Sequence, residues 1–381
     1  FGFSDVGPAF RLISSTTWDY DHADMKELNQ KIYGNDLAEK FDRYYKKSIE
    51  EDWFPDYSKN GWKMGFFAGN NGANWRATGS TWRKTAFEEL ETIVSLAPDM
   101  GVTSLYSDYV LPIAHHYERN DLMLQSRVPY LQVLNEAVPP LGEAVDDWEA
   151  NRRLAEAISR RAKERNIKPI QDAVDGRTVR RDYTKTLELY TMGGRVNNSK
   201  DVAQFIINAS HGIPKISFEE LSQKGIVKVE GVESTMWEKD ESPYHNEIVK
   251  SVKKKLPYET FTCRQQFYID HEWFIEFGET LPTFKEPLKI DEFPLRMMMG
   301  HARHGIHSTW RDDSFLLSLQ RGEPDIYVNP DDATNRGVQD GDMIRVYNTA
   351  GEFFAMAHAV SYTHLRAHET VLDLVCRLLL E

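Results

Sequence analysis

The stretch GHARHGIHSTW, residues 300–310, decides how the rest of the chain is interpreted. It holds three histidines, one arginine, two glycines and two hydroxyl side chains within eleven residues. Imidazole and guanidinium groups donate hydrogen bonds to oxygen, and glycine lets the backbone approach a ligand closely. This composition predicts a loop that binds a large polar ligand.

Two other interpretations of the stretch remain open on the residues alone. His301, His304 and His307 recur at every third position, which suggests a zinc site. On a helix, however, the third histidine would lie about 240° around from the first. Gly305 disfavours a rigid helix there, and no cysteine stands nearby to complete a common zinc set. The second interpretation is a loop whose histidines are purely structural.

Two further motifs flank the stretch in a fixed order. RQQFYIDH at residues 264–271, followed by a Leu-Pro pair at 281–282, precedes it. Asn-Pro at 329–330, Asp-Ala at 332–333 and GVQDGD at 337–342 follow it. Together the three motifs resemble the final cofactor-binding domain of the molybdopterin oxidoreductases, the dimethyl sulfoxide reductase superfamily. Within it they are most similar to the group of respiratory nitrate reductase, perchlorate reductase and ethylbenzene dehydrogenase.

The resemblance implies that this part of the chain contacts a pterin dinucleotide. The implied cofactor contacts are Gly300, His301, Arg303, Ile306, His307, Ser308 and Asn329.

The first half of the chain shows a second candidate site. Residues 61–68 form an apolar run that predicts a buried strand, residues 69–72 (GNNG) a loop, and residues 80–90 a helix. Such an arrangement offers backbone N–H groups to phosphate at a helix start, although Asn-Gly is equally a hairpin signal. The loop resembles the Gly-Asn loop of the superfamily, which implies cofactor contacts by Gly69 and Asn71.

Two more strands are expected at residues 91–97 and 109–112, with the loop 99–108 between them. Repeated strand-loop-helix units predict a parallel sheet, in which ligands bind at the carboxyl ends of strands. The loop is similar to the superfamily's Asp-x-x-x-Thr loop, which implies contacts by Asp99, Thr103 and Ser104. Residues 107–109 read Ser-Asp-Tyr where the family has Ala-Asp-Ile. His115 and His116 are adjacent, are expected to point apart, and are not expected to be metal ligands.

The fold class expected is α/β, in four parts. A partial parallel-sheet (Rossmann-like) domain is expected over residues 1–170, a connecting helical excursion over 171–255, and a truncated β-barrel-like molybdopterin dinucleotide-binding domain over 256–359. Within the last, strands are expected at 325–328, 343–347 and 352–357. Residues 360–381 resemble a translated sequencing adapter and are set aside, with a genuine amphipathic helix as the alternative. Outside that tail Cys263 is the one cysteine, so these residues alone predict neither a disulfide nor a cysteine-ligated cluster.

Composition excludes some classes of protein. A formal net charge of −13 disfavours a nucleic-acid binder. The sequence contains no run of eighteen apolar residues, so it predicts no membrane-spanning helix. The chain begins at Phe1 with neither an initiator methionine nor a signal peptide. It is therefore expected to be a C-terminal fragment, and its localisation cannot be read from a targeting segment.

The resemblance implies a fragment of the catalytic alpha subunit of a molybdenum oxidoreductase that performs oxo transfer in anaerobic respiration. The implied cofactor is molybdenum bis(molybdopterin guanine dinucleotide), with a [4Fe-4S] cluster in the part upstream. The implied partners are an iron-sulfur beta subunit and a haem b or membrane-anchor subunit, in a periplasmic or membrane-associated enzyme. A nitrate- or perchlorate-type oxyanion reductase is favoured over a hydrocarbon hydroxylase of the ethylbenzene dehydrogenase kind or another dehydrogenase of the group. A cofactor-free binding module is the alternative of another class. No residue is assigned as catalytic or as a metal ligand.

Overall fold

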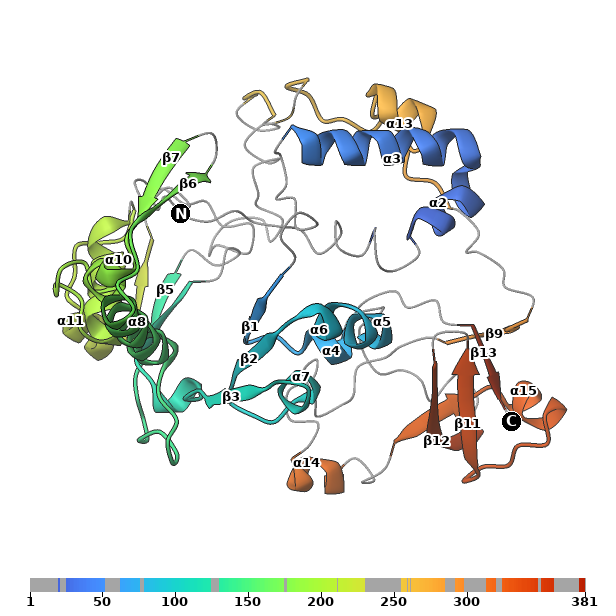
Figure 1. Cartoon of the computed structure of the whole chain (residues 1–381). Coiled ribbons are helices and arrows are strands. Elements are labelled where there is room, and N and C mark those ends of the chain that lie inside the picture. The colour runs from blue at the N-terminus through green and yellow to red at the C-terminus, as the bar shows by residue number, and fades with distance from the viewer. Residues whose placement is uncertain are drawn as a thin grey trace. The chain divides into compact units, whose positions relative to one another are not determined.

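The computed structural model describes residues 20, 25–51, 62–75, 79–124, 130–174, 177–210, 212–229, 255–258, 260, 262–284, 292–297, 313–319, 324–348, 351–359 and 377–380 (Figure 1). These residues belong to two compact units. One covers Leu111–Pro282, and the other covers Ser14–Val110 together with Thr283–Glu381.

A three-stranded sheet lies in the first half of the chain. β1 (Met64–Ala68), β2 (Thr92–Ala97) and β3 (Tyr109–Pro112) follow the order β1-β2-β3, and β1 runs parallel to β2. The short helices α4 (Gly72–Trp75), α5 (Gly79–Lys84) and α6 (Ala86–Glu89) connect β1 to β2, and α7 (Val102–Leu105) connects β2 to β3 (Figure 1). The predicted strands and the parallel pairing are confirmed.

The core of this part forms between β2 and the connecting helices. Ala73, Trp82, Ala86, Phe87 and Ile93 are its buried members. The expectation that the first strand is buried was wrong. Residues of β1 alternate between exposed and partly buried, because only one of its two faces packs on this core.

Two helices also precede this sheet. α2 (Met25–Tyr33) and α3 (Asn35–Glu50) are joined at Gly34, whose φ of +81° is the left-handed conformation that favours glycine. Tyr20 stacks on the rings of Phe41 and Tyr45 of α3, with centroids 5.3 and 4.6 Å away. Through these aromatic contacts, Tyr20 packs against the apolar side of α3.

The unit Leu111–Pro282 contains an antiparallel sheet backed by helices. β4 (Asp121–Leu124), β5 (Tyr130–Leu134) and β8 (Ile226–Lys228) follow the order β4-β5-β8. α10 (Ser199–Ala209) and α11 (Phe218–Lys224) contribute to the core against them. The buried members of this core are Leu131, Ile207, Ile213, Ile216, Leu221 and Val229.

The connecting excursion is not purely helical as expected. It begins with an antiparallel pair, β6 (Ile170–Val174) and β7 (Arg177–Arg181), before η2 (Tyr183–Lys185), α9 (Thr186–Tyr190), α10 and α11. β6 and β7 are rich in β-branched Ile, Val and Thr, which favour a pleated strand over a helix.

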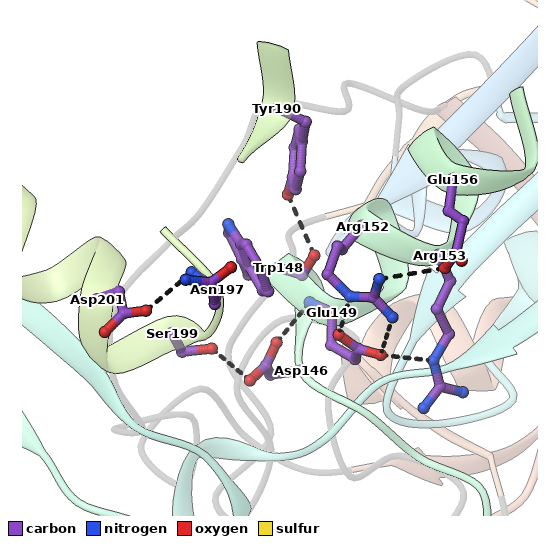
Figure 2. Close-up of polar contacts among 10 residues, drawn as sticks. All are labelled: Asp146, Trp148, Glu149, Arg152, Arg153, Glu156, Tyr190, Asn197, Ser199 and Asp201. Carbon is purple, nitrogen blue, oxygen red and sulfur yellow. Dashed lines mark hydrogen bonds and ion pairs between the residues drawn. The ribbon is translucent and has the colours of Figure 1, made fainter. Parts of the chain in front are cut away.

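The long helix α8 (Asp147–Glu164) begins at a capping aspartate. The Asp146 carboxylate accepts the Glu149 N–H at 2.7 Å and also accepts the hydroxyl of Ser199, the first residue of α10 (Figure 2). One side chain thereby joins the starts of two helices. The cap is Asp146, while the neighbouring Asp147 pairs with Arg119.

A carboxylate lies between two arginines in the first turn of α8 (Figure 2). Glu149 accepts Arg152 Nε at 2.7 Å, Arg152 Nη2 at 3.0 Å and Arg153 Nε at 2.8 Å. The Arg152 hydrogen bonds lower the pKa of Glu149 from 4.5 to about 2, with a further lowering by Arg153, although partial burial opposes them.

The stabilisation by Glu149 is therefore expected to disappear in acid. Because its pKa is lower in the folded state, the contribution is fully present above pH 4.5 and is lost as the pH falls towards about 2. Denaturant unfolding of the wild type and of Glu149→Gln from pH 6 to pH 2 checks this. The two stabilities should converge in acid, whereas Glu143→Gln, at an exposed position, should show no such convergence. A constant difference between wild type and Glu149→Gln across that pH range would contradict the assignment.

The last part of the chain forms a five-stranded sheet. β9 (Leu295–Arg296), β10 (Asp325–Val328), β11 (Met343–Asn348), β12 (Gly351–Ala359) and β13 (Arg377–Leu380) follow the order β10-β12-β11-β13-β9. α15 (Pro330–Asn335) packs on it through Ala333, beside Val328, Ile344, Val346 and Ala357. A further short helix, α14 (Ser314–Leu319), precedes β10.

The three strands predicted here are confirmed, and β11 and β12 pair antiparallel, with Asn348 opposite Gly351. Among the described residues this sheet is open, so the closed part of a barrel is not seen. Residues 377–380 of the tail pair with β11 and β9 through the backbone. The adapter origin of residues 360–381 stays a prediction.

Within the described ranges, no helix combines the length and the apolar character needed to cross a membrane.

Candidate functional site

The candidate site of the first half lies where β1 and β2 end. Because the two strands are parallel, their carboxyl ends open at the same edge of the sheet. Gly69 follows β1 with a φ of +56°, a left-handed conformation in which glycine is unstrained. Its N–H donates to the carbonyl of Leu96 at 3.2 Å, which fixes the start of the loop against β2.

One asparagine joins the loop after β1 to the loop after β2. Asn71 Oδ1 accepts the backbone N–H of Thr103 at 2.9 Å and the Thr103 hydroxyl at 3.1 Å. The same hydroxyl oxygen accepts the N–H of Ala73 at 3.1 Å. The Thr103 residue is only 1% exposed and Asn71 is partly buried, so the Thr103 end of these hydrogen bonds is shielded from water. Sequence reasoning placed Asn71 and Thr103 in two separate loops, and the structure brings them into direct contact.

Ser104 forms a second connection beneath the first. Its hydroxyl lies 2.9 Å from the hydroxyl of Ser95 in β2 and donates to the Asp99 carbonyl at 3.4 Å. Both serines are buried, and Asp99 is partly buried. The five residues predicted here therefore adjoin one another: Gly69 and Asn71 lie in the loop after β1, Asp99 lies in the loop after β2, and Thr103 and Ser104 lie in α7, which follows that loop. Their direct contact with a cofactor stays a prediction.

Sequence reasoning missed Gly101 and Arg83. A Cβ on Gly101 would lie 2.9 Å from Asn71 Nδ2 and 3.2 Å from its Cγ, so the Asn71 amide packs directly on this glycine. Arg83 Nη1 donates to the Ala73 carbonyl at 2.6 Å, and its guanidinium lies 5.7 Å from the Tyr106 ring centre. Gly101 stands inside the Asp-x-x-x-Thr motif, two residues before its threonine, and this position was the available signal for it. No local pattern marked Arg83.

Gly101→Ala is expected to destabilise the protein by about 1–3 kcal/mol, because the new methyl group displaces the Asn71 amide. Gly101 has a φ of −64°, so alanine meets no backbone strain there. In an Asn71→Ala background the same change should cost markedly less, because no amide remains to be displaced. Denaturant unfolding of both single variants and the double variant measures this coupling. Equal costs of Gly101→Ala in the two backgrounds would show that the steric contact is unimportant.

The second predicted site is only partly described. Gly300, His301, Arg303, Ile306, His307 and Ser308 lie outside the described residues. Asn329 is described: its Oδ1 accepts the N–H groups of Asp331 at 2.8 Å and of Asp332 at 3.4 Å, which caps α15. Gly337 follows that helix with a φ of +68°, as expected for its carboxyl end.

The adjacent histidines His115 and His116 lie at the start of a short 3-10 helix. His115 precedes η1 (His116–Glu118), and its N–H donates to Glu118 at 2.8 Å. The two imidazole rings lie edge to face with centroids 5.1 Å apart, so the expectation that they point apart was wrong: at the start of a 3-10 helix the two rings come into contact. Burial, and after it the Arg119 charge, lowers the pKa of His116. In the described part of the chain, no group of three His, Cys, Asp or Glu residues could hold a metal ion.

Cys263 is exposed and has a φ of +56°. This left-handed conformation is one that favours glycine over residues with a Cβ.

Comparison with known proteins identifies the family. Residues 34–157 match the family model described as Molybdopterin oxidoreductase, and residues 295–364 match the Molydopterin dinucleotide binding domain. The chain belongs to the molybdopterin oxidoreductases of the dimethyl sulfoxide reductase superfamily. The two domains imply the molybdenum bis(molybdopterin guanine dinucleotide) cofactor.

Curated relatives are similar over most of the chain. The respiratory nitrate reductase subunit alpha of Haloferax mediterranei is 33% identical over 90% of this chain and 36% of the relative. The dimethylsulfide dehydrogenase subunit alpha of Rhodovulum sulfidophilum is 32% identical over 93% of this chain and 40% of the relative. The perchlorate reductase subunit alpha of Dechloromonas aromatica is 32% identical over 91% of this chain and 37% of the relative. This chain thus spans 36–40% of the length of these relatives.

The fold is similar to that of one solved structure. Acetylene hydratase from Pelobacter acetylenicus matches with a TM-score of 0.53 and 17% identity, over 78% of this chain and 35% of that protein. This likeness concerns the fold alone.

The donor set at the edge of β1 and β2 fits a phosphate-bearing cofactor. Both lone pairs of Asn71 Oδ1 are used by Thr103, which leaves Nδ2 as the remaining polar group of that side chain. No described residue accepts a hydrogen bond from Nδ2. An amide donor beside a glycine turn is suited to phosphate oxygens.

Proposed function

We propose that this chain serves in the catalytic alpha subunit of a molybdenum enzyme that reduces an oxyanion of the nitrate or perchlorate type in anaerobic respiration. The nitrate and perchlorate reductase relatives support this substrate class. When bound, the molybdenum cofactor supplies the oxygen-atom transfer chemistry, and the protein supplies binding, orientation and electrostatics.

The observation that carries the proposal is the pairing of Asn71 with Thr103. It unites the two loops at the carboxyl ends of parallel strands, which is where open α/β sheets bind their ligands. In this proposal Gly69 allows the tight turn and Asn71 Nδ2 donates to a phosphate. Asp99 provides carboxylate oxygens for the N–H groups of guanine.

The second loop, residues 300–310, supplies positive charge. Arg303 is proposed to bind phosphate oxygens, with His301 and His307 as further donors. Gly300 gives the backbone close approach, and Ile306 and Ser308 complete the contact surface. Asn329 is proposed to position the loop region through the helix that it caps. Such a loop explains how a chain with a net charge of −13 could hold several phosphates.

A second candidate function has its own support. The dimethylsulfide dehydrogenase relative is as similar to this chain as the perchlorate reductase is, at 32% identity. The same subunit could therefore run as a dehydrogenase that oxidises its substrate, as a hydrocarbon hydroxylase would. The two family matches disfavour the cofactor-free binding module.

The proposal includes partners, because several relatives are named as alpha subunits. An iron-sulfur beta subunit would carry electrons, with a [4Fe-4S] cluster in the alpha subunit itself. A haem b or membrane-anchor subunit would place the enzyme at a membrane or in the periplasm.

A dye-linked assay tests the proposal. The enzyme that carries this chain should oxidise a reduced viologen dye when nitrate, perchlorate or chlorate is added. The control is the same assay with dimethyl sulfide and an oxidised dye as acceptor. Oxidation of dimethyl sulfide without reduction of any oxyanion would favour the second candidate, and neither reaction in a cofactor-loaded enzyme would contradict both.

A further inference from the structure

Thr103 was predicted to contact the cofactor, but its surroundings indicate another role. It is 1% exposed, and its hydroxyl has a partner in each direction: it donates to Asn71 Oδ1 at 3.1 Å and accepts the Ala73 N–H at 3.1 Å. The backbone N–H of Thr103 adds a third bond to Asn71 at 2.9 Å. The Thr103 hydroxyl therefore makes its hydrogen bonds within the protein.

The same bonds determine the orientation of the Asn71 amide. Two donors from Thr103 converge on one amide atom, which must be the oxygen. Gly101 packs against the Nδ2 side of the same amide, because a Cβ added to Gly101 would lie 2.9 Å from Asn71 Nδ2. With the oxygen held and the glycine behind it, Nδ2 is the group that the arrangement keeps available for a ligand.

The backbone around Asn71 is held by the same network. The Asn71 carbonyl accepts the N–H of Asn74 at 2.9 Å, and Arg83 binds the carbonyl of Ala73 at 2.6 Å. The loop after β1 is thus fixed from α5 on one side and from α7 on the other. Among the described residues, Thr103 is the one that bonds to both Asn71 and Ala73, so the spacing between the two strand-end segments depends on it.

We propose that Thr103 is a positioning residue that locks the two strand-end loops together and aims Asn71 Nδ2 at a phosphate of the pterin dinucleotide. This inference rests on the proposed function, since it presumes that the dinucleotide binds at this edge. It predicts that loss of the hydroxyl weakens cofactor retention although no ligand contact is removed.

The test compares three variants of the enzyme that carries this chain, isolated with its cofactor. Thr103→Val keeps the size and branching of the side chain but removes the hydroxyl, and Thr103→Ser restores it. Ser159→Ala is the matched control, because Ser159 is also buried and its hydroxyl accepts the Leu187 N–H at 2.9 Å from 28 residues away, in the other unit. The release rate of guanine dinucleotide and the melting temperature are measured for each.

Thr103→Val should release the dinucleotide on the order of ten-fold faster than the wild type, as expected for a misplaced hydrogen-bonding loop. Thr103→Ser should restore the wild-type rate. Ser159→Ala should lower the melting temperature without changing the release rate. If Thr103→Val does not fold, Gly101→Ala takes its place, since it displaces the Asn71 amide without removing a buried hydroxyl.

Two other outcomes would overturn the inference in distinguishable ways. Release from Thr103→Val, or from its replacement Gly101→Ala, no faster than from Ser159→Ala would remove the positioning role and leave the proposed function standing. A wild-type enzyme that holds no guanine dinucleotide would contradict the proposed function itself.

Discussion

Arg303→Ala is expected to weaken binding of the dinucleotide to the enzyme that carries this chain, while the protein still folds. A guanidinium can bind phosphate through two charge-assisted hydrogen bonds, and their loss from a desolvated pair costs about 2 kcal/mol or more. That corresponds to binding weakened by roughly 30-fold or more. His307→Ala is expected to act in the same direction with a smaller effect, because an imidazole offers fewer hydrogen-bond donors than a guanidinium. Molybdenum and guanine content, measured beside the melting temperature, checks both variants.

Arg336→Ala is the matched control for this prediction. Arg336 lies in the same domain, but its Nη1 donates to Asp332 within the chain, to the carbonyl at 3.1 Å and to Oδ1 at 3.4 Å. Its loss should leave the cofactor content unchanged. Normal cofactor loading in Arg303→Ala and His307→Ala would refute the assignment of the loop at residues 300–310.

Leu221→Ala is expected to destabilise the protein strongly. Leu221 is 0% exposed in the core of the β4-β5-β8 sheet, and the substitution leaves a cavity that costs about 2–5 kcal/mol. Leu189→Ala removes the same atoms from a side chain that is 69% exposed, and should cost less than about 0.5 kcal/mol. Denaturant midpoints of the two variants give the comparison. Similar midpoints would mean that this core does not stabilise the unit as described.

Much of the fold could be predicted from local pattern. The strands at residues 109–112 and 325–328 have the predicted bounds, because short apolar runs end at clear turn residues. The hairpin at residues 170–181 was missed, because its arginines and mixed charge mask the β-branched residues. The capping residue of α8 could not be chosen from the sequence, because Asp146 and Asp147 are both aspartates. Asp146 is the cap, whereas Asp147 binds Arg119, which lies 28 residues away in the sequence.

The segments that form the candidate site could be predicted from the sequence, but the contacts between their side chains could not. Sequence motifs pointed to the loops that hold Asn71 and Thr103, since a motif records which residue types occur at which spacing. They could not show that the Thr103 hydroxyl is already bonded inside the protein, because its partners lie 30 and 32 residues away. Gly101 was missed for the same reason: its importance comes from an amide in another loop. A positioning residue can therefore be distinguished from a residue that contacts the ligand only when its burial and its hydrogen-bond partners in other segments are known.

The most direct test of the account is chemical analysis of the cofactor bound to the purified enzyme that carries this chain. The account predicts molybdenum together with guanine nucleotide released by acid, in the one-to-two ratio that a bis(molybdopterin guanine dinucleotide) cofactor requires. Protein that is folded and produced in cells able to make this cofactor, yet contains neither molybdenum nor guanine, would contradict it.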